Sequence, residues 1–331
     1  MEDGLRAAFE AGDLPGLHAV VATLNGETIG EVYFAGEDGI WGKPLGHVDH
    51  GPATLHDVRS ITKSVVGLLY GIALDDGMVP PLDSPLLDHF PDYADLKDGS
   101  AREDITVRHA LTLQMGTEWN EDLPYTSAEN SEIAMELAED RYRFALDRPM
   151  VDPPGTKWSY NGGAVALIGK LIEDGAGMTL DAFAAERLFN PLGISQFEWI
   201  KGADGVASAA SGLRLTARDL TRIGQMVANG GLHEGRQIVP ADWLEQSFKP
   251  AGVIEGTFTY GFLWYLSTGP DGDTIAIAIG NGGQRLTVQP NFNFVLTTLA
   301  GRYNDPEAWK LALDVLLKHA VPEANRRLKS P

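Results

Sequence analysis

Strand-like patterns gather near the two ends of this 331-residue chain, and that distribution constrains its fold more than any other feature. Residues 18–24 and 27–34 flank Asn25-Gly26, a dipeptide typical of the type I′ turn of a β-hairpin, in which both central residues have positive φ. Further β-rich runs follow at 262–266, 274–279, 286–288 and 292–299. The chain therefore predicts an α+β fold in which strands from both ends join one antiparallel sheet flanked by helices.

The middle of the chain is rich in Pro, Asp and Leu and has helical patches with few strand signals. We expect residues 1–77 and 205–331 to form a discontinuous sheet domain and residues 78–204 an inserted, mostly helical domain. A ligand cleft is expected between the two. Helices are predicted at 3–11, from Ser60 to about 75, from Thr106, at 163–173 and 180–189, from Thr216 to 229, and at 305–319.

Composition excludes several classes of function. Lys and Arg number 26 against 46 Asp and Glu, so the net charge of −20 repels nucleic-acid phosphates and anionic membranes. The chain has no cysteine, which removes disulfides, thiolate metal sites and cysteine nucleophiles. Its eight histidines are scattered without a metal-binding spacing, so neither a metal site nor a cofactor is predicted.

The start of the chain is acidic and lacks the basic and apolar regions of a signal peptide. No apolar run reaches the roughly 18 residues that a membrane span requires. The expected location is therefore cytoplasmic, or periplasmic or secreted if a signal was removed. The sequence is compatible with a homo-oligomer and does not fix the oligomeric state.

Ser60 and Lys63 begin the most apolar helix-like segment of the chain, which continues through residues 64–74. Residues three apart lie on one helix face, so an amine is placed beside a hydroxyl that needs activation to act as a nucleophile. The surroundings look apolar, and we therefore expect burial to depress the pKa of Lys63. The alternative is a helix cap at Ser60 with Lys63 facing solvent.

Two further motifs combine with Ser60-x-x-Lys63: residues 154–162, PGTKWSYNG, and residues 280–284, GNGGQ. Together they resemble the β-lactamase-related serine hydrolases: class C β-lactamases, D-alanyl-D-alanine peptidases, esterases with a β-lactamase fold and 6-aminohexanoate-dimer hydrolases. The resemblance covers most of the chain and implies a β-lactamase/transpeptidase-like fold. It also implies that Ser60 is the acylated nucleophile and that Lys63 and Tyr160 act as general acid and base.

The third motif implies substrate-binding roles. The backbone N–H of Gln284, with that of Ser60, is expected to form the oxyanion hole, and Gly282 and Gly283 to allow close approach of the backbone to a ligand. A simple bulge or turn is the alternative for the glycines. Asn281 and Asn161 are the other candidate substrate contacts.

The chain departs from the family pattern at two positions. The usual Tyr-x-Asn is here Tyr160-Asn161-Gly162, so the amide has moved by one residue or is absent. Asn281-Gly282-Gly283 occupies the place of Lys-Thr-Gly, which removes the cation that binds a β-lactam carboxylate; Arg285 is a possible substitute. These departures favour the esterase and 6-aminohexanoate-dimer hydrolase side of the family.

We therefore expect a serine hydrolase that cleaves small carboxylic esters or simple amides through an acyl-enzyme, without metal or cofactor. A β-lactamase or D-alanyl-D-alanine carboxypeptidase is the second hypothesis, and a catalytically silent member that binds a ligand or partner is the third. A Ser-His-Asp triad is disfavoured because the G-x-S-x-G elbow is absent, and His56 and His109 are expected to be structural. Trp119, Tyr125 and Trp158 are expected in the pocket walls.

Overall fold

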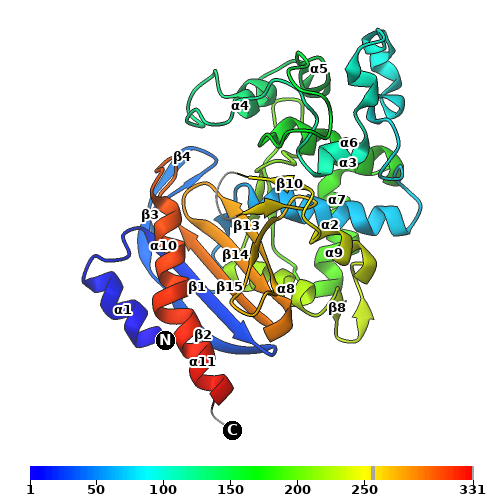
Figure 1. Ribbon diagram of the computed structural model, residues 1–331. Coiled ribbons are helices and arrows are strands. Elements are labelled where there is room, and N and C mark those ends of the chain that lie inside the picture. The colour runs from blue at the N-terminus through cyan, green and yellow to red at the C-terminus, as the bar shows by residue number, and fades with distance from the viewer. Residues whose placement is uncertain (255–257, 330–331) are drawn as a thin grey trace.

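A large antiparallel sheet forms the centre of the protein (Figure 1). The structure is a computed structural model that describes residues 1–254 and 258–329. The sheet has the order β10-β11-β12-β13-β14-β15-β1-β2, and every neighbouring pair is antiparallel. Its strands are Gly252–Val253, Thr259–Tyr260, Tyr265–Thr268, Thr274–Gly280, Gln284–Gln289, Phe294–Ala300, Leu17–Leu24 and Glu27–Tyr33. Strands from both chain ends therefore meet at the β15–β1 pair, as the sequence predicts.

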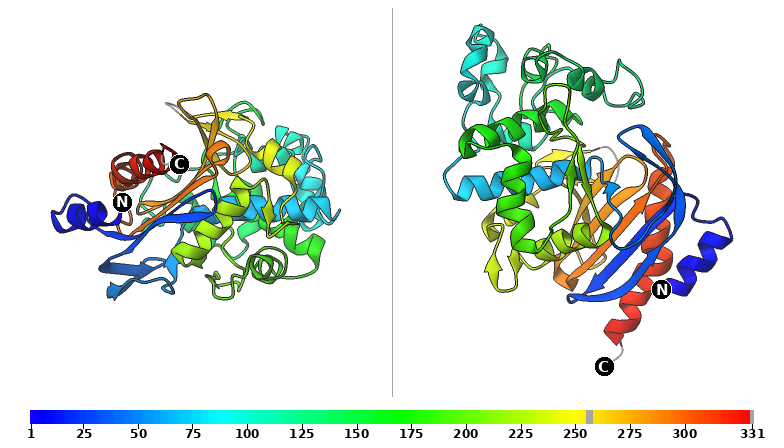
Figure 2. Two further views of the ribbon diagram at one scale, coloured as in Figure 1. Left: turned by 90° about the horizontal axis from the view of Figure 1, so that it is seen from below. Right: turned by 180° about the vertical axis from the view of Figure 1, so that it is seen from behind.

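Helices cover both faces of this sheet (Figure 2). On one face lie α2 (Ile61–Asp75) and α8 (Ala217–Ala228), which contact β13 to β15 and β1. On the other face α1 (Glu2–Glu10) packs beside a continuous C-terminal helix formed by α10 (Ala308–Asp314), η7 (Val315–Ala320) and α11 (Val321–Lys329). Strand β1 is buried on both faces, in agreement with its largely apolar sequence, which only His18 and Thr23 interrupt.

The helical region stands beside one edge of the sheet (Figure 1). Its helices are α3 (Val107–Leu111), α4 (Ser131–Glu136), α5 (Arg141–Leu146), α6 (Gly162–Ala176), α7 (Leu180–Ala184) and η4 (Ala185–Phe189), with shorter turns at η1 (Leu86–His89), η2 (Pro91–Leu96), η3 (Ala101–Asp104) and η5 (Asn190–Leu192). Helix α2 packs against α6 as well as the sheet. It is therefore buried on nearly all sides, in agreement with its apolar sequence.

Smaller elements complete the chain. Hairpin β3 (Ala35–Ile40) and β4 (Lys43–Asp49) is separate from the large sheet, as is the short three-stranded sheet β5 (His56–Asp57), β7 (Leu213–Leu215) and β6 (Glu198–Trp199). The remaining elements are β8 (Leu232–His233), β9 (Arg236–Gln237), α9 (Ala241–Ser247) and η6 (Pro290–Phe292). Within the described ranges no helix is both long and apolar enough for a membrane span.

Local sequence signals account for several boundaries. Asn25 and Gly26 have φ of 52° and 80°, as the type I′ turn requires. Thr216 accepts a hydrogen bond from the N–H of Asp219 and so caps α8. Two predictions need correction: the β-rich run at 262–266 forms a strand only from Tyr265, and the last helix extends to Lys329 rather than to residue 319.

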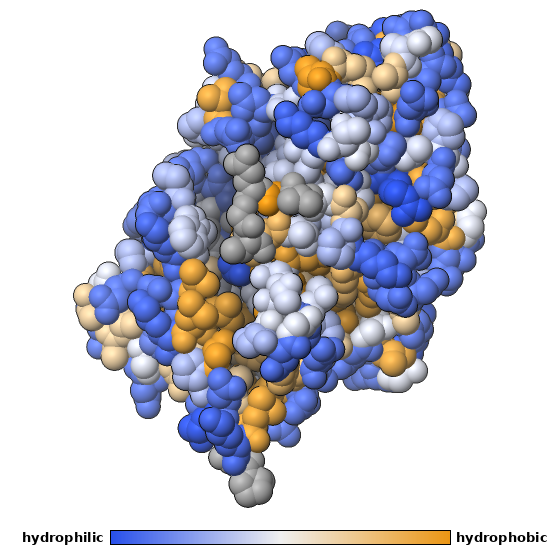
Figure 3. Space-filling model, viewed as in Figure 1, coloured by the Kyte–Doolittle hydropathy of each residue, from blue (hydrophilic) through white to orange (hydrophobic). Residues whose placement is uncertain are grey.

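The surface seen in Figure 3 is mostly hydrophilic, in keeping with the acidic composition. Hydrophobic residues gather on this face mainly along the C-terminal helix. Trp309, Leu317 and Leu328 are its large exposed apolar side chains.

Candidate active site

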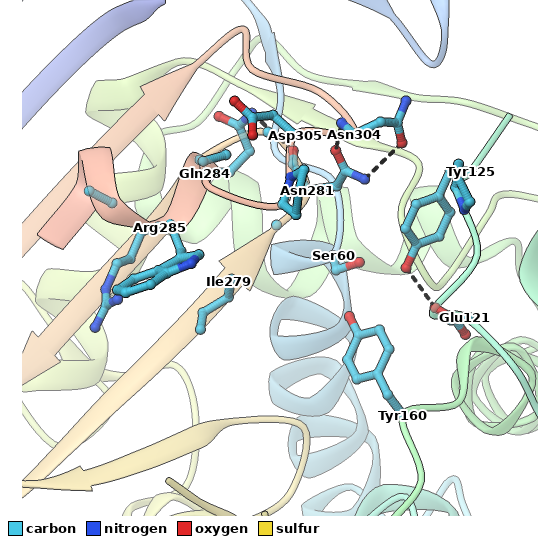
Figure 4. A pocket seen from close by; sticks show the side chains of 18 of the residues that line it. Ser60, Glu121, Tyr125, Tyr160, Ile279, Asn281, Gln284, Arg285, Asn304 and Asp305 are labelled. Carbon is cyan, nitrogen blue, oxygen red and sulfur yellow. Dashed lines mark hydrogen bonds between the residues drawn. The ribbon is translucent and has the colours of Figure 1, made fainter. Parts of the chain in front are cut away.

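Ser60 lies immediately before the first residue of α2, at the floor of a pocket (Figure 4). Its side chain makes no capping hydrogen bond, so the hydroxyl is available for chemistry. The preceding residue, Arg59, has a φ of 51°, an unfavourable value for a residue other than glycine. Arg59 is held by Asp57, 3.2 Å from its Nε, and by stacking of its guanidinium on Tyr303 at 4.7 Å. The chain around Ser60 is thus a strained turn fixed by contacts on both sides.

Lys63 is almost fully buried and donates hydrogen bonds to three oxygens. Its Nζ lies 3.3 Å from Ser60 Oγ, 3.1 Å from Glu132 Oε2 and 3.0 Å from the Ala210 carbonyl. Only the ammonium form has three protons to donate. Burial acts to lower the pKa of Lys63, but the charges of Glu132, Tyr160 and Glu121 and the hydrogen bond to Glu132 together outweigh it, and the pKa lies above its usual range. The prediction of a depressed Lys63 pKa is therefore wrong, because it assumed an apolar site without a carboxylate.

Glu132, on α4, is the carboxylate that the sequence did not reveal. It is 1 % exposed, and its Oε1 accepts a 2.5 Å hydrogen bond from the Ser211 hydroxyl. Asn130 caps the start of α4 and accepts from the N–H groups of Glu132 and Ile133. Burial acts to raise the pKa of Glu132, but the charge of Lys63 and the hydrogen bonds with Ser211, Glu121 and Lys63 together outweigh it, so the pKa lies below its usual range. Lys63 and Glu132 therefore form a buried ion pair behind Ser60.

Tyr160 approaches Ser60 from the other side, with its hydroxyl directed at the serine (Figure 4). Lys63 Nζ lies over the Tyr160 ring, 4.7 Å from its centre. Burial and the carboxylates Glu121 and Glu132 raise the pKa of Tyr160, while Lys63 and a hydrogen bond with Ser60 act to lower it. The net direction is upward, and the phenol therefore carries its proton at neutral pH.

Glu121 is a second unexpected carboxylate at the site. It accepts hydrogen bonds from Trp119 Nε1 at 2.6 Å, the Tyr125 hydroxyl at 2.8 Å and the Gly162 N–H at 2.6 Å. Burial and repulsion from Glu132 raise the pKa of Glu121 to about 7. This group therefore changes its charge near neutral pH beside the candidate catalytic residues.

Gly162 stands where the family pattern has asparagine, and the two carboxylates explain the difference. A Cβ on Gly162 would lie 2.7 Å from Glu132 Oε2 and 3.0 Å from Glu121 Oε1. Asn161 is buried and caps α6, since its Oδ1 accepts from the Ala164 N–H at 2.9 Å. The expectation that Asn161 contacts substrate is corrected accordingly: its side chain is used to begin a helix.

The β13–β14 hairpin, residues 280–284, forms the wall opposite Tyr160. Gly282 and Gly283 have φ of 97° and 95°, so the turn itself requires glycine. Gln284 is fully buried, and its amide pairs with the backbone of Ala300 at 2.6 and 2.9 Å. Asn281 lines the pocket, but its side chain is paired with Asn304. The groups of this hairpin that a substrate can contact are therefore mainly backbone N–H and C=O groups.

Two cavities of about 500 and 490 Å³ meet at Ser60. Tyr125, Asn281 and Asn304 line both. The first extends past Ile279 to Arg285 and the C-terminal helix, and the second is bounded by the β3–β4 hairpin and Glu132. Of the predicted wall residues only Tyr125 lines these cavities. The prediction that Trp119 and Trp158 line the pocket needs correction. Trp119 packs against Gly163, and Trp158 packs against Tyr260.

Arg285 lies at the far end of the first cavity from Ser60 (Figure 4). Its Nε donates to Thr287 Oγ1 at 3.2 Å, and no carboxylate of the described residues lies within 4 Å of it. Burial lowers the pKa of Arg285 to about 10. A half-buried guanidinium without a carboxylate thus faces the pocket.

The histidines are not placed as members of a catalytic triad. His109 closes a capping box with Thr106 at the start of α3. His56 hydrogen-bonds to His18 and to the Asp57 carbonyl instead of Ser60. Both are structural here, as the absence of the G-x-S-x-G elbow indicates.

Comparisons with known proteins agree with this fold. A family model described as Beta-lactamase matches residues 4–319. A 6-aminohexanoate-dimer hydrolase of Paenarthrobacter ureafaciens is 24 % identical over 282 residues, covering 77 % of this chain and 68 % of the relative. A solved structure of a putative 6-aminohexanoate-dimer hydrolase from Bacillus anthracis superposes with a TM-score of 0.78 at 20 % identity, over 98 % of this chain and 82 % of the other. A family VIII carboxylesterase gives a TM-score of 0.69 at 16 % identity, over 98 % and 95 %.

Proposed function

Because the chain belongs to the beta-lactamase family, we propose that it is a serine hydrolase that cleaves carboxylic esters or simple amides through an acyl-enzyme on Ser60. One observation carries the proposal: the Ser60 hydroxyl and the Lys63 ammonium, from the start of α2, meet the Tyr160 phenol, from a distant part of the chain, at the pocket floor. The hydrolase names of its relatives support the same reaction class.

Proton transfer in this proposal runs through Tyr160. Lys63 is already protonated and donates to Ser60 Oγ, so it cannot take the serine proton. As Ser60 attacks the carbonyl, the neutral phenol takes the serine proton and passes its own proton to the leaving oxygen or nitrogen. In deacylation a water proton reaches Tyr160 and the phenol proton returns to Ser60. Both steps balance without a free phenolate.

The negative charge that develops on the carbonyl oxygen needs hydrogen-bond donors. We propose the N–H of Ser60, at the positive end of the α2 dipole, and an N–H of the 280–284 hairpin. Gly280 packs closely there, since a Cβ on it would lie 2.4 Å from the Val58 carbonyl. This close approach places the hairpin backbone beside the nucleophile.

Arg285 favours one class of substrate within this proposal. A cation with no carboxylate partner among the described residues, at the far end of the pocket, suits a substrate whose negative end is remote from the bond that is cleaved. The relative named for 6-aminohexanoate dimer acts on an amide of that description. β-Lactams are less favoured, because Asn281 brings no cation to the place of the family lysine and is paired with Asn304.

A burst assay with a p-nitrophenyl ester tests the proposal. We expect a stoichiometric burst followed by steady turnover, and a loss of roughly 10⁴-fold or more in Ser60→Ala. Ser64→Ala is the matched control, since Ser64 lies on the same helix but donates to the Leu263 carbonyl at 2.6 Å. Full activity in Ser60→Ala would overturn the proposal.

A covalent probe and a β-lactam substrate separate the proposal from its two alternatives. A fluorophosphonate probe is expected to label the folded protein at Ser60, and failure to label would favour a catalytically silent binding protein. Nitrocefin turnover is expected to be far slower than ester turnover. Comparable rates on the two substrates would favour a β-lactamase.

A further inference from the structure

A second buried polar cluster adjoins the Asp57–Ser60 segment through His56, whose ring hydrogen-bonds to the Asp57 carbonyl. It brings together His18 of β1, Asp38 of β3, His50 after β4 and His56 of β5. The side chains of His18, Asp38 and His50 are 0 to 2 % exposed. One donor atom from each of these three lies within 4.8 Å of the other two. Residues far apart in the chain therefore converge, with the His18 and His50 rings stacked 4.0 Å apart, so the His50 ring has to turn for both nitrogens to reach one ion.

The hydrogen bonds fix which ring nitrogens carry protons. His56 Nδ1 lies 2.9 Å from the Asp57 carbonyl, which can only accept, so this nitrogen is protonated. In the neutral ring His56 Nε2 then accepts, and its partner at 3.0 Å, His18 Nδ1, must donate. His18 Nε2 is left with a free lone pair. Burial lowers the pKa of His18 to about 3 and that of His50 to about 4, which keeps both rings neutral.

Three atoms of the cluster have no hydrogen-bond partner among the described residues: His18 Nε2, His50 Nε2 and Asp38 Oδ2. Asp38 Oδ1, in contrast, accepts from the Gly39 N–H at 2.8 Å and the Tyr303 hydroxyl at 2.9 Å. His50 Nε2 and Asp38 Oδ2 are 3.9 Å apart, too far for a hydrogen bond. Buried groups of this kind normally have partners, so the orphaned set calls for an occupant.

The neighbouring backbone keeps the open edge of His18 clear. A Cβ on Gly36 would lie 2.7 Å from His18 Nε2, and one on Gly301 would lie 2.9 Å from the same atom. A side chain at either position would press against the nitrogen that carries the lone pair. Glycine at both positions keeps side chains away from this nitrogen, which is itself buried.

We propose that His18 Nε2, His50 Nε2 and Asp38 Oδ2 bind a divalent transition-metal ion, with zinc as the best match. Two imidazoles and one carboxylate are a common zinc ligand set and leave a fourth position for water. The hydrogen bond from His18 Nδ1 to His56 supplies the support that metal-bound imidazoles usually receive. The prediction from sequence that no metal site exists considered only local spacing.

Metal binding at this position would connect β1 to the β3–β4 hairpin, which forms a wall of the second cavity. Its role is structural, because none of the cluster's side chains hydrogen-bonds to Ser60, Lys63 or Tyr160 among the described residues. The inference stands independently of the proposed hydrolysis.

Zinc binding to chelator-treated full-length protein tests the inference. We expect one zinc per chain by metal analysis after desalting, and a rise in Tm of about 5 °C at zinc concentrations about 100 times Kd. Cobalt, used as a spectroscopic probe, should give the visible absorption of a four-coordinate site with nitrogen and oxygen ligands. Ester turnover by the zinc-free protein is expected to persist.

Variants locate the site. Asp38→Asn and His50→Gln should lose the bound zinc, the cobalt spectrum and the rise in Tm, and His47→Gln, on the exposed face of β4, is the matched control. His50→Gln is the variant that is expected to stay folded, since His50 Nε2 has no hydrogen-bond partner among the described residues that the substitution could remove. Folded wild-type protein without stoichiometric zinc, or zinc binding unchanged in both variants, would overturn the inference.

Discussion

Two buried polar clusters flank the Asp57–Ser60 segment, and they differ in how their atoms are satisfied. Around Ser60 a buried cation meets a buried carboxylate, and every proton of Lys63 has an acceptor. Around His18 the rings are neutral and three buried atoms have no partner among the described residues. The first cluster is complete without a ligand and is arranged to move protons. The second is complete only if something binds to it.

The largest expected difference comes from Lys63→Met. Removing the ammonium leaves Glu132 as an unpaired buried charge, which should lower the free energy of unfolding by about 3–5 kcal/mol and abolish ester turnover. His18→Gln in zinc-free protein should cost only about 1–2 kcal/mol, because no buried charge loses its partner. Urea unfolding measures both. Equal losses would erase the distinction between the two clusters.

A double variant sharpens this result. Adding Glu132→Gln to Lys63→Met removes the orphaned charge, so stability should largely return while turnover stays absent. Recovery of activity together with stability would show that Lys63 has only a structural role.

Tyr160→Phe separates chemistry from stability within the first cluster. The ring that lies under Lys63 is kept and only the hydroxyl is lost. We expect kcat to fall by roughly 10²–10⁴, with a change in unfolding free energy below about 1 kcal/mol. Turnover within tenfold of wild type would remove Tyr160 from the proton path.

Glu121 makes the first cluster sensitive to pH. Its pKa is raised from 4.5 to about 7, so between these values the folded state binds more protons than the unfolded state. Stability should therefore fall as pH rises through this window, by roughly 3 kcal/mol at most. Glu121→Gln should abolish that slope and the inflection near pH 7 in the profile of kcat/KM. An unchanged profile would assign the inflection to another group.

Arg285 has no carboxylate partner within the described ranges, and its replacement gives the smallest expected effect. Arg285→Met should raise KM about tenfold, or about 1.4 kcal/mol, for an amide with a remote carboxylate. KM for the matching methyl ester of that carboxylate should stay unchanged. Equal shifts for both substrates would show that the arginine only packs against the pocket.

Sequence reasoning reached the residues that belong to local motifs. Ser60 and Lys63 are three residues apart on a helix, and Tyr160 is part of a recurrent segment, so their identities needed no coordinates. The single sheet followed from strand patterns at both ends. Their catalytic roles and the domain boundaries at 77/78 and 204/205 remain predictions.

The functional residues that sequence reasoning missed were missed for one reason. Glu132 and Glu121 are two of 46 acidic residues, and nothing local distinguishes them from those at the surface. A lysine in an apolar helix implied a partner somewhere, but only tertiary structure could select it. The histidine cluster draws its members from three strands and from the residue that follows β4, so no spacing rule applies. Hairpin β3–β4 went unpredicted because it is half exposed and interrupted by glycines and a proline.

The left-handed backbone at Arg59 has a consequence for how the protein loses function. Such a conformation costs on the order of 1–3 kcal/mol and persists only while its surroundings enforce it. Here Asp57 and Tyr303 do so, and Tyr303 is in turn held by Asp38. Loosening of that outer support would let the nucleophile drift out of alignment while the sheet is still intact. Inactivation on heating should therefore precede global melting.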